Sequence, residues 1–87
     1  MEVAVMQIEN LGELRKMLTN RVCVILKATR EDLDMSQEKF AGLLGWTRAM
    51  VANLECGRRT LTFADFVLIA RALNIDPERL LRRVLQW

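Results

Sequence analysis

The fold of this chain is decided by residues 36–59, which read SQEKFAGLLGWTRAMVANLECGRR. Ser36 predicts the start of a helix, because its hydroxyl accepts a hydrogen bond from the N–H groups left free in a first helical turn. Gly45 predicts the end of that helix, since glycine adopts the left-handed backbone without steric cost. Thr47 and Gly57 repeat the same two signals. We therefore expect two short helices joined by a tight turn.

The hydrophobic residues of this stretch recur at helical spacing. Those expected to be buried are Phe40, Leu43, Leu44, Trp46, Val51 and Leu54. Two helices of about eight to ten residues, separated by three residues that include a glycine, are typical of a helix-turn-helix. The outer side of the second helix is then left for polar or small side chains.

A longer helix is expected before this motif. Asn10 is a suitable N-cap, and apolar residues follow within an arc of about 120°: Leu11, Leu14, Leu18, Val22, Ile25 and Leu26. The pattern ends near Glu31, whereas Thr19 and Asn20 are poor helix formers that leave open a kink or a break. Residues 2–8 alternate loosely, which predicts either a short strand or a disordered leader.

Two more helices are expected after the motif. The first starts between Thr60 and Thr62 and carries Phe66, Ile69, Ala70 and Leu73 at helical spacing through to Asn74. The second starts at Asp76-Pro77, an N-cap followed by proline at the first helical position. Its apolar residues are Leu80, Leu81, Val84, Leu85 and Trp87. They cover roughly 160° of the helix, more than one core contact requires.

The composition argues against several classes of protein. A chain of 87 residues that is 52% hydrophobic, with one proline, suits a single small folded domain. No apolar run approaches the roughly 18 residues of a membrane span, and no signal peptide is visible, so we expect a cytoplasmic protein. The chain has no histidine, and Cys23 and Cys56 lie outside metal-ligand spacing, so no metal, no cofactor and no enzymatic activity are expected.

The charges are unevenly distributed. Residues 1–35 carry five Lys or Arg against six Asp or Glu, residues 36–60 carry four against two, and residues 61–87 carry four against three. The positive excess therefore falls in the middle and at the end of the chain, where a surface facing phosphates needs it.

Residues 36–59, with their flanks, resemble the helix-turn-helix of the Cro and phage-repressor family, also called the xenobiotic-response-element type. The likeness covers about residues 21–82 and rests on Arg30, Ser36, Gln37, Ala41, Gly45, Thr47, Val51, Leu54, Glu55 and Gly57. It implies an all-α, five-helix, lambda-repressor-like DNA-binding domain over residues 21–87. Residues 1–20 form an N-terminal extension in this reading. Asp34 departs from the family's common glycine, although aspartate tolerates left-handed backbone.

The resemblance also implies which residues meet DNA, because the family's second motif helix enters the major groove. The implied DNA-binding residues are Gln37, Thr47, Arg48, Ala49, Met50, Asn53, Arg58, Arg59 and Thr60. Arg48 is suited to guanine O6 and N7, a contact that discriminates by about 1–3 kcal/mol. Arg58 and Arg59 suit phosphates, which position the protein without reading sequence. The family further carries a salt bridge at the positions of Arg30 and Glu55.

A sequence-specific repressor that acts as a homodimer on an inverted repeat is the function that the resemblance implies. We expect the last helix to supply most of the dimer interface, through Leu80, Leu81, Val84, Leu85 and Trp87, with the N-terminal extension, residues 1–20, as a second candidate contact. One edge of this helix is expected to pack inward and the other to meet the partner. The alternative is an antitoxin whose partner is a toxin and which also represses its own operon.

Overall fold

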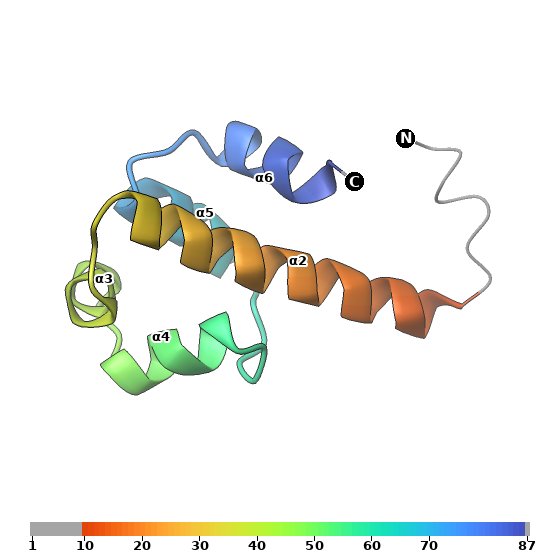
Figure 1. Cartoon of the computed structure of the whole chain (residues 1–87), viewed down its shortest axis with the longest axis horizontal. Coiled ribbons are helices and arrows are strands. Elements are labelled where there is room, and N and C mark those ends of the chain that lie inside the picture. The colour runs from red at the N-terminus through yellow and green to blue at the C-terminus, as the bar shows by residue number, and fades with distance from the viewer. Residues whose placement is uncertain (1–9, 87) are drawn as a thin grey trace.

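The computed structural model describes residues 10–86, so the predicted strand at residues 2–8 lies outside the described part of the chain. Within it five helices follow one another: α2 (Leu11–Asp32), α3 (Gln37–Leu44), α4 (Arg48–Glu55), α5 (Phe63–Ala72) and α6 (Pro77–Leu85) (Figure 1). Residues 10–86 contain no strand. The predicted all-α class is confirmed.

Helix α2 runs for 22 residues without a break at Thr19 or Asn20. Its start is fixed by Asn10, whose Oδ1 accepts a hydrogen bond from the N–H of Gly12 at 2.9 Å. Both poor helix formers are exposed to solvent, so neither needs a partner inside the fold. Figure 1 shows the first half of α2 projecting beyond the other helices, and we call residues 11–21 the α2 arm.

Local signals place the ends of the short helices where the sequence predicts them. Ser36 Oγ accepts from the N–H of Lys39 at 3.0 Å, and Gly45 ends α3 with a φ of 71°. Asp34, in the turn before α3, has a φ of 53°, so aspartate does occupy the left-handed region there. Asp76 caps α6, with Pro77 in its first turn.

The core is built from the inner faces of all five helices. Its buried hydrophobic residues are Cys23, Leu26, Phe40, Ala41, Val51, Leu54, Phe66, Ile69, Ala70, Leu73, Leu80 and Val84. The prediction that Leu43 is buried is wrong, because its side chain is 54% exposed. The inward face of α3 is centred on Phe40, Ala41 and Leu44, which turns Leu43 about a third of a turn towards solvent.

A long-range contact joins α2 to the end of α6. Arg21 Nε donates to the carbonyl oxygen of Val84 at 2.6 Å, and Arg21 Nη2 donates to those of Arg83 and Gln86. The last carbonyl groups of a helix lack partners within it, and a cation there also complements the helix dipole. Arg21 therefore closes α6 and fixes it against the middle of α2.

Candidate nucleic-acid interface

The outer side of α4 is the surface that the helix-turn-helix presents to solvent. Arg48, Ala49 and Asn53 are exposed on it. Thr47 caps the helix by accepting from the N–H of Met50 at 3.2 Å. Met50 itself is half-buried, and its sulfur accepts from the N–H of Thr47 at 3.5 Å. This places Met50 back over the start of α4 and leaves Arg48, Ala49 and Asn53 as the outward groups.

A buried ion pair holds α4 against α2. Arg30 Nε donates to Glu55 Oε2 at 2.6 Å and Arg30 Nη2 donates to Glu55 Oε1 at 3.0 Å, with the two side chains 8% and 4% exposed. Arg30 Nη1 also donates to the carbonyl oxygen of Met35 at 2.6 Å. The structure thus brings together the two residues that the family likeness pairs, and the bidentate geometry fixes the end of α4.

Gln37 belongs to the same buried group. Its Nε2 donates to Glu55 Oε1 at 3.0 Å, so the amide nitrogen of this implied DNA-binding residue is engaged inside the protein. Burial by itself raises the pKa of the Glu55 carboxyl, but the hydrogen bonds from Arg30 and Gln37 outweigh it and hold this pKa below its ordinary value. The hydrogen bond to Glu55 raises the pKa of Arg30.

The charge on α4 is one-sided as a result. Glu55 is the only acidic residue of α4, and the ion pair with Arg30 neutralises its charge. The exposed side of α4 therefore carries Arg48 with no carboxylate beside it on the same helix. Such a surface attracts an anionic partner.

The loop after α4 carries the other candidate residues. The N–H groups of Arg58 and Arg59 donate to the carbonyl oxygen of Asn53 at 2.8 and 3.1 Å, which folds the loop back on the helix. Arg58 and Thr60 are exposed. The guanidinium carbon of Arg59 lies 4.4 Å from the centre of the Trp46 ring. This cation–π contact ties the loop to the turn before α4.

Sequence reasoning missed that contact. Trp46 is half-buried and packs against the core on one side, as its size predicts, while Arg59 covers it on another. The available signal was Trp46 itself, because a tryptophan in the turn between two helices leaves an aromatic face to cover. Arg21 gave no local signal at all.

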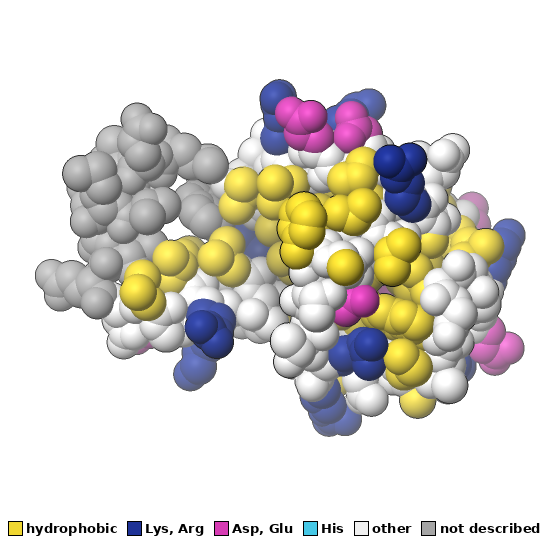
Figure 2. Space-filling view, turned by 180° about the vertical axis from the view of Figure 1, so that it is seen from behind, with side chains coloured by type: hydrophobic (Ala, Val, Ile, Leu, Met, Phe, Trp, Pro, Cys, Tyr) yellow, Lys and Arg dark blue, Asp and Glu magenta, His cyan; other side chains and the backbone are white. Residues whose placement is uncertain are grey.

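The predicted dimer residues separate into two sets. Leu80 and Val84 are buried in the core of the chain itself, so the monomer already uses them. Leu81 is 43% exposed and Leu85 is half-buried, whereas Trp87 lies outside the described residues. Hydrophobic side chains also gather over α5 and along the α2 arm on the face seen in Figure 2. Phe63 and Leu68 of α5 are 81% and 57% exposed.

Residues 10–86 contain neither a membrane-spanning helix nor a metal-binding cluster. None of the described helices has the length and hydropathy needed to cross a membrane. Within the same range no three His, Cys, Asp or Glu side chains lie close enough to hold a metal ion.

Known proteins with a helix-turn-helix share this architecture. A helix-turn-helix family model matches residues 26–80. The restriction-modification controller protein C.AhdI from Aeromonas hydrophila is 31% identical, with a TM-score of 0.66 over 71% of this chain and 94% of that chain. The controller protein C.Esp1396I, solved as a tetramer with its natural 35 base-pair operator, is 26% identical, with a TM-score of 0.68 over 79% of this chain and 96% of that one.

A third solved structure shares the fold alone. The clp gene regulator ClgR from Corynebacterium glutamicum is 18% identical, with a TM-score of 0.71 over 77% of this chain and 71% of that chain. No curated protein sequence is significantly similar to this one. These similarities confirm the predicted five-helix fold. The family model matches from residue 26 onwards, so its match begins well inside α2.

Proposed function

The chain belongs to the helix-turn-helix family of the Cro and phage-repressor type, and from this premise we propose that it represses transcription as a homodimer on an inverted-repeat operator. The family and the similar solved structures support a role as a DNA-binding regulator. The observation that carries the proposal is the exposed side of α4, where Arg48 and Asn53 stand on a helix held by the Arg30–Glu55 pair.

In this proposal α4 enters the major groove and its first turn meets the base edges. Arg48 lies at the first position of α4, directly after the Thr47 cap, where side chains of a recognition helix reach furthest into the groove. A guanidinium there suits the two acceptors of a guanine. Ala49 offers its methyl group to a thymine, and Asn53, more than a turn along, suits a base edge or a phosphate.

Phosphate contacts are assigned to the loop and to the helix cap. Thr47, Arg58, Arg59 and Thr60 lie at the two ends of α4, where the DNA backbone passes a helix lodged in the groove. Gln37 and Met50 are weaker candidates, because both have a polar or sulfur atom engaged within the protein.

Two copies are proposed because one small domain meets one half-site. A two-fold pair places two recognition helices about 34 Å apart, one turn of DNA. The tetrameric complex of C.Esp1396I with its operator supports assembly in this family. On α6 the proposed contact narrows to Leu81 and Leu85, because Leu80 and Val84 are buried in the monomer.

The test of sequence-specific binding is a selection from randomised DNA with wild type, Arg48→Ala and Arg58→Ala. Loss of the Arg48 contact should relax preference at one base pair per half-site. Loss of Arg58 should weaken all sequences alike and lower the slope of log K against log salt by about one unit. A wild-type chain that selects no sequence would overturn the proposal.

The test of assembly is sedimentation of the full chain. We expect a dimer at micromolar concentration and a monomer for Leu81→Glu, with Arg79→Glu on the same helix as the control. A wild-type monomer at high micromolar concentration would remove the homodimer from the proposal while leaving the assignment of α4 in place.

A further inference from the structure

A cleft of about 420 Å³ lies between the α2 arm and the loop that follows α4. Arg15 and Leu18 of the arm form one side, and residues 57–61 form the other. Figure 1 shows this loop below the middle of α2, with the arm extending beyond it towards the start of the helix. The cleft therefore joins the family's helix-turn-helix to a part of α2 that the family model, residues 26–80, does not cover.

The lining of the cleft is positive. Arg15, Arg58 and Arg59 line it, and no aspartate or glutamate does. Within residues 10–86, Arg15 and Arg58 enter no ion pair. Arg59 Nε is buried and has no hydrogen-bond partner among the described residues. Three arginines with no carboxylate facing them make the cleft suited to an anionic ligand.

The remaining lining is apolar. Leu18, Val22 and Leu61 form a hydrophobic wall beside the arginines. A bare phosphate ion has no use for such a wall, because its whole surface is polar and well hydrated. A phosphate attached to a sugar fits both parts of the cleft.

We propose that this cleft binds a sugar–phosphate unit of the DNA backbone, with the phosphate held by Arg15 and Arg58 and the deoxyribose against Leu18 and Leu61. This assignment rests on the proposed function. Only if α4 enters the major groove does a DNA strand pass the end of α4, where the cleft lies. It makes Arg15 a DNA-binding residue that the family's motif does not contain. The α2 arm then lengthens the footprint of each protomer on DNA.

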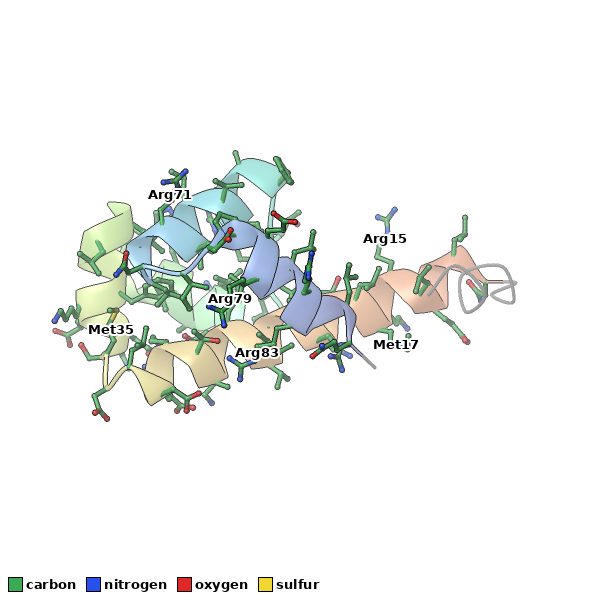
Figure 3. The ribbon with its side chains drawn as sticks, turned by 90° about the horizontal axis from the view of Figure 1, so that it is seen from above. Arg15, Met17, Met35, Arg71, Arg79 and Arg83 are labelled. Carbon is green, nitrogen blue, oxygen red and sulfur yellow. The ribbon has the colours of Figure 1, made fainter. Side chains whose placement is uncertain are left out.

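The arm offers a matched control beside the residue to be tested. Arg15 and Lys16 carry the same charge on adjacent exposed positions, but only Arg15 lines the cleft. Figure 3 shows Arg15 and Met17 projecting from opposite sides of α2, so consecutive arm residues face different surroundings. Arg15→Ala and Lys16→Ala therefore remove equal charge at different places.

The experiment measures the affinity of the full chain for its selected operator at 50 and 200 mM salt. If Arg15→Ala loses one phosphate contact, the slope of log K against log salt should fall by about 0.9 unit in this variant. The affinity ratio of wild type to variant should then shrink by about 3.5-fold over this fourfold change in salt. Lys16→Ala should keep the wild-type slope. Equal slopes for Arg15→Ala and wild type would overturn the DNA assignment.

A second measurement separates the DNA backbone from a free phosphate ester and does not need an operator. In a Trp87→Phe background, Trp46 fluorescence reports on Arg59, which covers its ring. Titration with inorganic phosphate and with a deoxynucleoside monophosphate should give weak binding, stronger for the nucleotide and reduced in Arg15→Ala. Saturable binding with an unchanged DNA slope would reassign the cleft to a free ester. No response to either probe, with equal DNA slopes, would remove the site even if the chain binds its operator.

Discussion

The two halves of α2 have the same apolar spacing and opposite surroundings. The second half buries Cys23, Leu26, Thr29 and Arg30 against the helix-turn-helix and α6. In the arm, Leu11 is 74% exposed although it continues the same side of the helix. The difference shows that periodicity predicts which side of a helix is ready to be buried, whereas the rest of the fold decides what covers it.

The largest expected effect tests the buried half. Arg30→Ala should lower the free energy of unfolding by about 3–5 kcal/mol, because Glu55 is left charged and buried without its partner. Urea denaturation followed by circular dichroism measures this loss. The control is Arg82→Ala, which breaks the exposed Glu78–Arg82 pair and should leave the urea midpoint unchanged. Similar midpoints for the two variants would show that the buried pair does not hold α4.

A pair of leucine substitutions compares the two halves directly. Leu26→Ala should cost about 2–5 kcal/mol, since the side chain is fully buried and its removal leaves a cavity. Leu11→Ala should stay within about 0.5 kcal/mol, because solvent already reaches most of that side chain. The same denaturation experiment at low micromolar concentration measures both. A large loss in Leu11→Ala would mean that the arm is covered in solution.

The helix caps give a smaller contrast. Thr47→Ala should cost about 1 kcal/mol, because the cap of α4 is coupled to the packed core. Asn10→Ala removes an equivalent hydrogen bond from the arm, where fraying of one turn breaks no core contact. We expect its unfolding midpoint to match wild type while hydrogen exchange at the first turn of α2 accelerates. A shifted midpoint would indicate that the arm folds cooperatively with the domain.

The smallest expected effect is the loss of stability at acid pH that depends on Glu55. The pKa of Glu55 is held below its ordinary value by Arg30 and Gln37, so its contribution to stability is fully present above the unfolded pKa of about 4.3. That contribution is lost as the pH falls through the lower folded pKa. Wild type should therefore destabilise more steeply than Glu55→Gln below about pH 4.3, as measured by urea midpoints between pH 7 and 3. Parallel curves for the two proteins would contradict this assignment.

Local signals in the sequence were enough to predict most of the fold. Ser36, Thr47 and Asp76 each cap a helix through their own neighbours within three residues, so chain order alone carries the information. The exposed side of α4 follows from the same periodicity, because buried Val51 and Leu54 fix the opposite side.

The features that were missed depend on distant residues. Arg21 meets carbonyl groups 62 to 65 positions away, and nothing near it in the sequence indicates this role. The cleft depends on how far the arm overhangs residues 57–61, which is a property of the packed helices. Leu43 was misplaced for a related reason, since the neighbours of α3 set the centre of its inward side.

The hydrogen bonds from Arg21 to the end of α6 can form only late in the synthesis of the chain on the ribosome. The partners of Arg21 are the last carbonyl groups of the final described helix, so the contact forms only after that helix has emerged. At roughly 5–20 residues per second, the 54 positions from Asp32 to Gln86 take about 3–11 s to translate. Throughout that interval the side of α2 that α6 later contacts is uncovered. The core, which includes Leu80 and Val84 of α6, is therefore completed only after the last described helix has been made.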